Sequence, residues 1–267
     1  MRLPAVDVRG RAPFLEGPRP RVIAHRGFGR HGPGNTLAAF ERALDAGADL
    51  LETDVRASLD GVAFLQHDAE IVDRAGGRHR VDRTRAEELS LLTLEGGEHP
   101  ATLTEALERL PEARFNLDVK ARDAIGPTIA AVRAAGAERR VLVTSFSESR
   151  RRRTRRSLPG SATSASAPLF VAALVSAHAN APWLVRRVLA GIDALQVPES
   201  ALGLRVATPR ILAHLHSSGC EIHLWTIDDP DRMTELLALG VDGLVTDRTD
   251  LARDAVDAYL RGPAQRS

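Results

Sequence analysis

Short β-rich segments alternate with longer amphipathic segments from residue 21 onward, and this alternation constrains the fold more than any other feature. At four places a helix that ends in glycine leads directly into the next strand, in the sequences AGAD, AGAERR, SGCE and LGVD. Strands that alternate with helices in this way predict a parallel sheet. About eight such units favour a single-domain (β/α)8 TIM barrel, with an open doubly wound sheet as the alternative.

The expected elements follow from periodicity and from start and stop residues. Strands are expected at 21–25, 50–57, 62–66, 114–120, 141–146, 161–165, 194–197, 221–227 and 243–246. Helices are expected at 104–110, 124–135, 209–218 and 230–239, and another should be capped by Asn35 or Thr36.

The chain is expected to form one domain with short extensions. Residues 1–20 read as an extended lead-in outside the core, residues 21–258 as the barrel domain, and residues 259–267 as a C-terminal tail. The longest interruption, residues 68–103, follows the second strand region. It predicts a loop-rich cap over the active face.

Charge and cysteine content exclude several classes of protein. The chain has 36 basic and 35 acidic residues, so its net charge of +1 gives no general attraction to nucleic acid or membranes. A single cysteine, Cys220, excludes an internal disulfide framework and suits a reducing compartment. The chain has no signal-peptide run and no apolar stretch of about 18 residues, so we expect a cytoplasmic protein without stable membrane insertion. The oligomeric state stays open.

Two carboxylates stand two residues apart on one predicted strand. Side chains at this spacing point to the same face, so Glu52 and Asp54 share one volume. Two acids in an otherwise apolar strand are costly unless a partner neutralises them. A divalent cation is such a partner, because carboxylate oxygens are hard ligands.

Further polar residues end neighbouring predicted strands. His25 ends the first strand, His67 follows the run 62–66, and Asp118 and Lys120 end the strand RFNLDVK. Active sites of barrels lie at the carboxyl ends of the strands, where these residues should meet. A histidine on either side of a bound cation could give and take protons. A bound metal ion with an acid and a base beside it can catalyse the hydrolysis of a phosphate ester.

Simpler interpretations cover other polar residues. Six more histidines lack such a context and are expected on the surface or in loops: His31, His79, His99, His214, His216 and His223. The arginine run Arg150–Arg156 is expected to form a solvated helix face, and its lack of aromatic residues argues against nucleic-acid binding. For Trp225, packing in the core and contact with a ligand at the barrel mouth stay equally open.

Together these motifs resemble the glycerophosphodiester phosphodiesterase family, over about residues 21–252. The matching segments are AHRG (24–27), NTLAAF (35–40), GADLLETDV (47–55), SLDG (58–61), QHD (66–68), DVK (118–120), TSFS (144–147), LWTID (224–228) and GVDGLVTD (240–247). The resemblance implies a (β/α)8 barrel that uses a divalent cation to hydrolyse small-molecule glycerophosphodiesters to an alcohol and glycerol 3-phosphate.

The resemblance also implies roles for individual residues. His25 and His67 match the acid/base pair, and Arg26 and Lys120 match cations that bind the phosphate. Trp225 matches an apolar substrate contact. Glu52, Asp54 and Asp118 match positions of the metal site, and three carboxylates suit Ca²⁺, Mg²⁺ or Mn²⁺ alike.

Two positions depart from the family pattern. Gly34 stands where the family usually has glutamate, and Asp118 replaces a glutamate two residues before the lysine. The first change removes a carboxylate, and the second shortens one by a methylene. Two alternative functions stay open. One is a related lysophospholipase D-type enzyme acting on lysophospholipids, which would need an apolar channel for an acyl chain. The other, which the two altered acids suggest, is a barrel that binds phosphodiesters or an ion without hydrolysing them.

Overall fold

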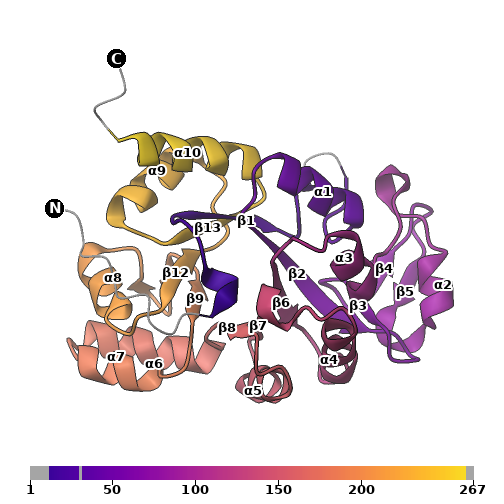
Figure 1. The fold of residues 1–267 in the computed structure, drawn as a ribbon, viewed down its shortest axis with the longest axis horizontal. Coiled ribbons are helices and arrows are strands. Elements are labelled where there is room, and N and C mark those ends of the chain that lie inside the picture. The colour runs from indigo at the N-terminus through magenta and orange to yellow at the C-terminus, as the bar shows by residue number, and fades with distance from the viewer. Residues whose placement is uncertain (1–11, 30–31, 263–267) are drawn as a thin grey trace.

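Eight parallel strands form a nearly closed barrel in the computed structural model, which describes residues 12–29 and 32–262 (Figure 1). The strands are β1 (Arg21–His25), β2 (Leu50–Ala57), β6 (Phe115–Val119), β7 (Val141–Thr144), β8 (Ala162–Thr163), β9 (Ala194–Val197), β12 (Glu221–Leu224) and β13 (Gly243–Thr246). They pair in the order β8-β7-β6-β2-β1-β13-β12-β9. Ser164, directly after β8, bridges Ala194 in β9 and joins the two ends. The predicted TIM barrel is confirmed, and the open sheet is excluded.

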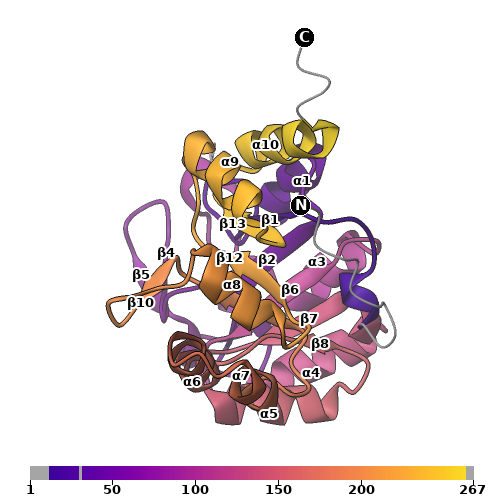
Figure 2. The same cartoon turned by 90° about the vertical axis from the view of Figure 1, so that its left-hand side faces the viewer.

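Helices surround the barrel, as the side view in Figure 2 shows. They are α1 (Leu37–Asp45), α3 (Leu103–Arg109), α4 (Ile125–Ala134), α5 (Glu148–Ser157), α6 (Ala167–His178), α7 (Pro182–Val188), α8 (Pro209–His216), α9 (Pro230–Leu239) and α10 (Thr249–Arg261). Thr36, rather than Asn35, caps α1, because its hydroxyl accepts a hydrogen bond from the amide of Ala39. Asn35 is therefore free for another role.

The period of two along each strand decides which side chains face the barrel interior. On β1 it places Arg21 and Ile23 inside, below His25. Arg21 is fully buried and forms an ion pair of 2.8 Å with Glu221 on β12. His223 is also fully buried, and its Nε2 lies 3.1 Å from Glu221. The expectation of a surface or loop position for His223 was wrong, because it shares the inward face of its strand with Glu221.

The lead-in contributes to the core as well. Residues 13–15 form a short 3-10 helix, η1, in which Phe14 and Leu15 are buried against barrel residues that include Ile23. The Arg114 guanidinium donates a hydrogen bond of 3.0 Å to the carbonyl of Phe14. The prediction of an extended lead-in outside the core was thus wrong for this part, and residues 1–11 lie outside the described residues.

Residues 68–103, the longest interruption between the barrel elements, form a small substructure beside the barrel (Figure 1). It contains β4 (Glu70–Val72), β5 (Arg78–Arg80), η3 (Val81–Arg83), α2 (Ala86–Ser90) and η4 (Glu95–Gly97). It follows β3 (Ala63–Leu65), which pairs antiparallel with the end of β2. Its buried side chains, Ile71, Val81 and Leu89, pack on Phe64 rather than over the barrel. The segment is loop-rich as predicted.

Smaller expectations can also be compared with the structure. Helix α10 runs to Arg261, beyond the predicted start of the tail at residue 259. Helix α5 carries the arginine run, yet Arg151 is buried and pairs with Glu148 at 2.8 Å, so only part of this run is solvated. Cys220 is buried as predicted. Within residues 12–29 and 32–262, no helix combines the length and apolarity that crossing a bilayer requires.

Candidate active site

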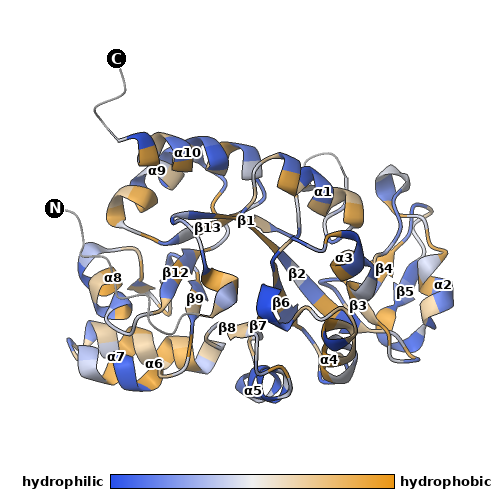
Figure 3. Cartoon of the chain, in the orientation of Figure 1, coloured by the Kyte–Doolittle hydropathy of each residue, from blue (hydrophilic) through white to orange (hydrophobic). Residues whose placement is uncertain are grey.

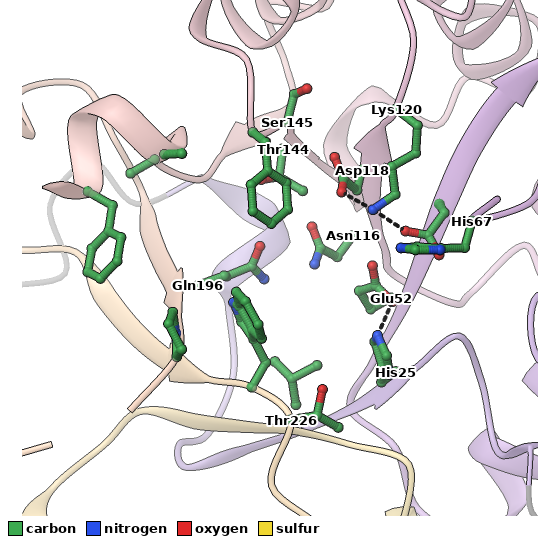
Figure 4. Close-up of a pocket in the computed structure, with 18 of the residues that line it drawn as sticks. His25, Glu52, His67, Asn116, Asp118, Lys120, Thr144, Ser145, Gln196 and Thr226 are labelled. Atoms are coloured by element: carbon green, nitrogen blue, oxygen red, sulfur yellow. Dashed lines mark hydrogen bonds and ion pairs between the residues drawn. The ribbon is translucent and has the colours of Figure 1, made fainter. Parts of the chain in front are cut away.

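A cavity of about 440 Å³ opens at the carboxyl ends of the barrel strands. All eight residues that the sequence singled out line it: His25, Arg26, Glu52, Asp54, His67, Asp118, Lys120 and Trp225. Figure 4 labels His25, Glu52, His67, Asp118 and Lys120 among them, together with Asn116 and Gln196. The predicted meeting of distant polar residues at one mouth of the barrel is therefore observed.

Neighbouring strands bring two of the carboxylates together. Asp54 on β2 and Asp118 on β6 are paired in register, and the ammonium of Lys120 contacts both, at 2.7 Å and 2.6 Å. Burial disfavours ionisation of Asp54, but Lys120 and Arg26 hold its pKa below the usual value. Burial raises the pKa of Asp118 despite Lys120, whose own pKa the two carboxylates raise against the effect of burial. Lys120 is thus engaged with acids here rather than free for a phosphate.

Glu52 is the least neutralised of the three acids. Burial raises its pKa well above the usual value, and the charges of Asp54 and Asp118 add to this effect. The backbone amide of Arg26 donates a hydrogen bond of 3.1 Å to Glu52 Oε2. The positive charges of Arg26 and Lys120 therefore do not fully compensate the three carboxylates of the site.

This donor set fits a divalent cation in its chemistry. Three buried carboxylates supply hard oxygen ligands, and the Asp118 Oδ1 and Asn116 Oδ1 atoms are buried with no hydrogen-bond partner among the described residues. A cation would also relieve the charge that raises the pKa of Glu52. In the described part of the chain, however, no three His, Cys, Asp or Glu side chains already form a ready-made metal group. The ammonium of Lys120 stands between two of the three acids.

Each of the two histidines has one ring nitrogen within hydrogen-bonding distance of a carboxylate. The Nδ1 atom of His25 lies 2.8 Å from Asp247 Oδ1, and that of His67 lies 2.9 Å from Asp68 Oδ1. The Nε2 atom of His25 lies 4.0 Å from Glu52 Oε2, on the cavity side. A neutral imidazole that donates through Nδ1 has a free lone pair at Nε2. Both side chains can therefore carry protons at the cavity.

The first loop is shaped by glycine. Gly27 has φ +83°, and a Cβ there would lie 2.7 Å from the carbonyl carbon of Ala39, so only glycine fits. The preceding Arg26 also has a positive φ, of 57°, and its Nε lies 3.1 Å from Asp54 Oδ2. At Gly34, a Cβ would lie 3.0 Å from the Cβ of Arg26. The absence of a side chain at Gly34 thus leaves space that the Arg26 side chain closely approaches.

Three polar residues of the site were not singled out by sequence reasoning. Asn35 donates a hydrogen bond of 3.2 Å to Asp54 and accepts one of 2.7 Å from Thr53. Asn116 precedes Asp118 by two residues, and Asp247 directly follows β13. The spacing of two on one strand could have indicated Asn116, and the position after a strand could have indicated Asp247. The role of Asn35 depends on a turn with φ +60°, which no periodicity reveals.

Both interpretations of Trp225 stay open, because its side chain lines the cavity and also packs against core residues that include Ile23 and Val245. Its ring lies 6.4 Å from that of Phe146 in an edge-on arrangement. Phe146 is 59% exposed, and the ammonium of Lys120 lies 5.7 Å from the centre of its ring. An aromatic pair thus stands at the border between the charged residues and the rest of the cavity.

Of the six histidines that were expected on the surface or in loops, four lie outside the core and do not line this cavity. His79 and His99 belong to the segment 68–103, and His214 and His216 to α8. His31 lies outside the described residues.

A parallel barrel with acids, imidazoles and cations at the carboxyl ends of its strands defines a TIM barrel with the groups of an acid–base active site. The sequence model of the Glycerophosphoryl diester phosphodiesterase family matches residues 25–251, and the chain belongs to this family.

Individual relatives agree with this assignment. The chain is 39% identical to "Probable glycerophosphodiester phosphodiesterase 2" of Mycobacterium tuberculosis over 239 residues, covering 89% of this chain and 90% of the relative. A crystal structure of glycerophosphodiester phosphodiesterase from Agrobacterium tumefaciens is 29% identical, with a TM-score of 0.73 over 88% of this chain and 98% of that one. An Oleispira antarctica phosphodiesterase, solved with the product sn-glycerol-3-phosphate, shares the fold at 22% identity and a TM-score of 0.72, covering 90% and 98%.

Proposed function

We propose that this chain hydrolyses glycerophosphodiesters to glycerol 3-phosphate and an alcohol, with His25 and His67 as proton carriers and a divalent cation at the acidic cluster. One observation supports this most strongly. All of the acids, imidazoles and cations expected from the sequence line a single cavity in a member of this family.

Each histidine has a distinct part in the proposed reaction. The carboxylate of Asp247 holds the Nδ1 side of His25, so its Nε2 is available to remove a proton from the attacking hydroxyl. His67, oriented by Asp68, returns a proton to the departing alkoxide. Each proton transfer is typically worth about 10²–10⁴-fold in rate.

The anionic phosphodiester also needs positive charge around it. Glu52, Asp54 and Asp118 would hold the cation, which when bound supplies charge that neutralises the non-bridging phosphate oxygens. Arg26 lies at the same wall and would add a charge-assisted contact to the phosphate. Lys120 would do so once it is released from one of its two carboxylates.

A metal-by-substrate screen on the purified full chain tests this function. Glycerophosphocholine is incubated with protein treated with EDTA and then supplied with Ca²⁺, Mg²⁺ or Mn²⁺, and glycerol 3-phosphate is measured. We expect no release with EDTA and recovery with at least one cation. Full activity in excess EDTA rules out the metal role. Binding of the substrate without release under every condition would instead favour the non-hydrolytic barrel.

Other properties stay predictions of the sequence. They are the cytoplasmic location, the lack of nucleic-acid partners and the choice among the three cations.

A further inference from the structure

Positive charge is concentrated in one segment of the chain. Residues 125–188 contain eleven arginines, no lysine and only two acids, Glu138 and Glu148. Because the whole chain has a net charge of +1, the remaining residues together are net negative. Asymmetry of this kind is typical of proteins that contact a nucleic acid or an anionic membrane surface. The small net charge of the chain therefore does not describe the charge of this segment.

The basic segment forms one side of the barrel. It contains α4, α5, α6 and α7, of which α5 packs on α4 and α6, and α6 packs on α7. Two views at right angles place these helices along the same side of the molecule (Figure 1, Figure 2). We call this the basic side of the barrel. The arginines of the segment are thus gathered on one side instead of being distributed over the whole surface.

Part of the arginine run on α5 has contacts within the fold. Arg150 donates a hydrogen bond of 3.1 Å to the carbonyl of Val119 in β6, and Arg151 pairs with Glu148. Arg155 donates a hydrogen bond of 3.1 Å to the carbonyl of the residue that caps the end of the helix. The fold therefore explains these three arginines.

The other three arginines of the run, Arg152, Arg153 and Arg156, are exposed and weakly neutralised. The Nε atom of Arg152 lies 3.9 Å from Glu148, a carboxylate that Arg151 already binds at 2.8 Å. In the described part of the chain, Arg153 and Arg156 have no ion pair. Arg152 and Arg156 are four residues apart, where like charges destabilise a helix. An external anion would relieve this repulsion.

These exposed arginines line a surface depression of about 580 Å³ on α5. All of its lining residues are arginines or serines: Ser149, Arg152, Arg153, Arg156 and Ser157. Their spacing of three and four residues places them in a row along one face of the helix, about 12 Å long. Guanidinium groups and hydroxyls are donors that suit phosphate oxygens. A row of this length fits several anionic groups side by side rather than a single ion.

Exposed apolar side chains lie on the helices beside this row. Val175 on α6 is 50% exposed, and Trp183 on α7 is 62% exposed. Figure 3 shows α5 as hydrophilic and α6 as largely hydrophobic. Tryptophan is favoured where a bilayer meets water, because its ring is apolar and its N–H group is polar. Single-stranded nucleic acids are instead bound through aromatic rings among the basic residues, and α5 has none. The combination favours an anionic bilayer.

We propose that the basic side of the barrel is a docking surface for bilayers that contain anionic lipids. Arg152, Arg153 and Arg156 contact lipid phosphates, and Trp183 lies among the head groups. Helix α5 begins two residues after Phe146, which lines the cavity, so the docking surface ends at the rim of the cavity. Docking goes beyond the proposed hydrolysis and does not depend on it.

Co-sedimentation of the full chain with lipid vesicles tests the docking surface. One set of vesicles contains equal parts of phosphatidylglycerol and phosphatidylcholine, and the other contains phosphatidylcholine alone. At low ionic strength we expect binding to the first set only, and added salt should weaken it because salt screens exposed charges. Absence of binding to the anionic vesicles, or equal binding to both sets, overturns the proposal. Binding to a DNA duplex but not to anionic vesicles also overturns it.

A triple variant tests the role of the arginine row. Replacing Arg152, Arg153 and Arg156 together by glutamine should weaken binding to anionic vesicles by about a hundredfold, from about fivefold for each arginine. Glutamine is a good helix former, so α5 is kept. The control removes the same charge from three exposed arginines outside the basic side: Arg74→Gln, Arg83→Gln and Arg85→Gln. The control variant should bind as the wild type does, and equal weakening in both variants overturns the proposal.

The fluorescence of Trp183 tests its contact with the bilayer. The chain has two tryptophans, and the other, Trp225, lines the cavity. On anionic vesicles the emission of the wild type should shift to shorter wavelength, and Trp183→Phe should remove this shift. No shift in the wild type, or a shift that persists in Trp183→Phe, contradicts the proposed contact. None of these measurements requires hydrolysis, so failure of the proposed function leaves this test intact.

Discussion

The Nδ1 atom of His25 lies 2.8 Å from Oδ1 of Asp247, although the two residues are 222 positions apart in the chain. The contact exists because the first and last strands of the barrel, β1 and β13, are neighbours, so their ends meet at one mouth. It holds the imidazole with its Nε2 toward the acidic cluster. Closure of the barrel therefore orients a side chain that the proposed reaction needs.

Replacing Asp247 should impair turnover more than substrate binding. Asp247→Asn removes the charge that stabilises a protonated His25 but keeps a side chain of similar shape, so kcat should fall by about tenfold or more. The KM for glycerophosphocholine should change little. Steady-state kinetics measure both, with Asp254→Asn on the exposed face of α10 as control. A change in KM alone would contradict this role for Asp247.

Cation binding should depend on Asp118. Its Oδ1 is buried and finds no hydrogen-bond partner within residues 12–29 and 32–262, and Asp118→Asn replaces a charged ligand by a neutral one. Affinity for Mn²⁺, measured by calorimetry on the full chain, should weaken by at least about tenfold. Asp123→Asn, an exposed acid that does not line the cavity, should leave the affinity as in the wild type. Equal affinities in the two variants would place the cation elsewhere.

Gly27 should be required for its close contact and not only for its φ. Gly27→Ala strains the backbone and also drives a methyl group into the backbone of Ala39, at 2.7 Å. Gly61 has nearly the same φ, +82°, but open space around it, so Gly61→Ala is a matched control for strain. The free energy of unfolding from urea titration should fall by about 1–3 kcal/mol more for Gly27→Ala. Equal losses would show that strain alone matters.

Stability should decrease in acid because of one buried ion pair. Burial opposes ionisation of Glu221, but hydrogen bonds from His223 and Arg21 lower its pKa to about 2. Because the folded pKa is below the usual 4.5, the stabilisation is complete above about pH 4.5 and is lost as the pH falls toward 2. It amounts to about 3 kcal/mol in total.

Urea unfolding between pH 5 and pH 3 measures this effect. The slope of stability against pH should be smaller in the double variant Arg21→Met/Glu221→Gln, which removes both charges together. An unchanged slope in that variant would assign the acid sensitivity to other carboxylates.

The sequence was sufficient to predict the barrel and the charged residues of the site. Alternation of strands and helices determines a parallel sheet, and the period of two places Glu52 beside Asp54 on one face. The ends of parallel strands then bring His25 and Asp118 to the same mouth. These features depend on local pattern and on one topological rule.

Features that depend on contacts between distant loops could not be predicted in this way. The apolar lining of the cavity combines Phe146 after β7, Phe170 on α6 and Leu202 in a hairpin, and no periodic pattern relates these three. The burial of Phe14 under the barrel likewise depends on the path that the chain takes before β1. His223 was misplaced because a polar residue inside the barrel is stable only with its partner Glu221.

The release of glycerol 3-phosphate from glycerophosphocholine by His25→Ala and His67→Ala tests the central claim most directly. Measured at saturating divalent cation, each variant should be slower than the wild type by at least about a hundredfold, with an unchanged circular dichroism spectrum. His99→Ala, an exposed histidine outside the cavity, should keep the wild-type rate. A near-normal rate in either folded cavity variant would contradict the account of two imidazoles acting at one acidic cluster.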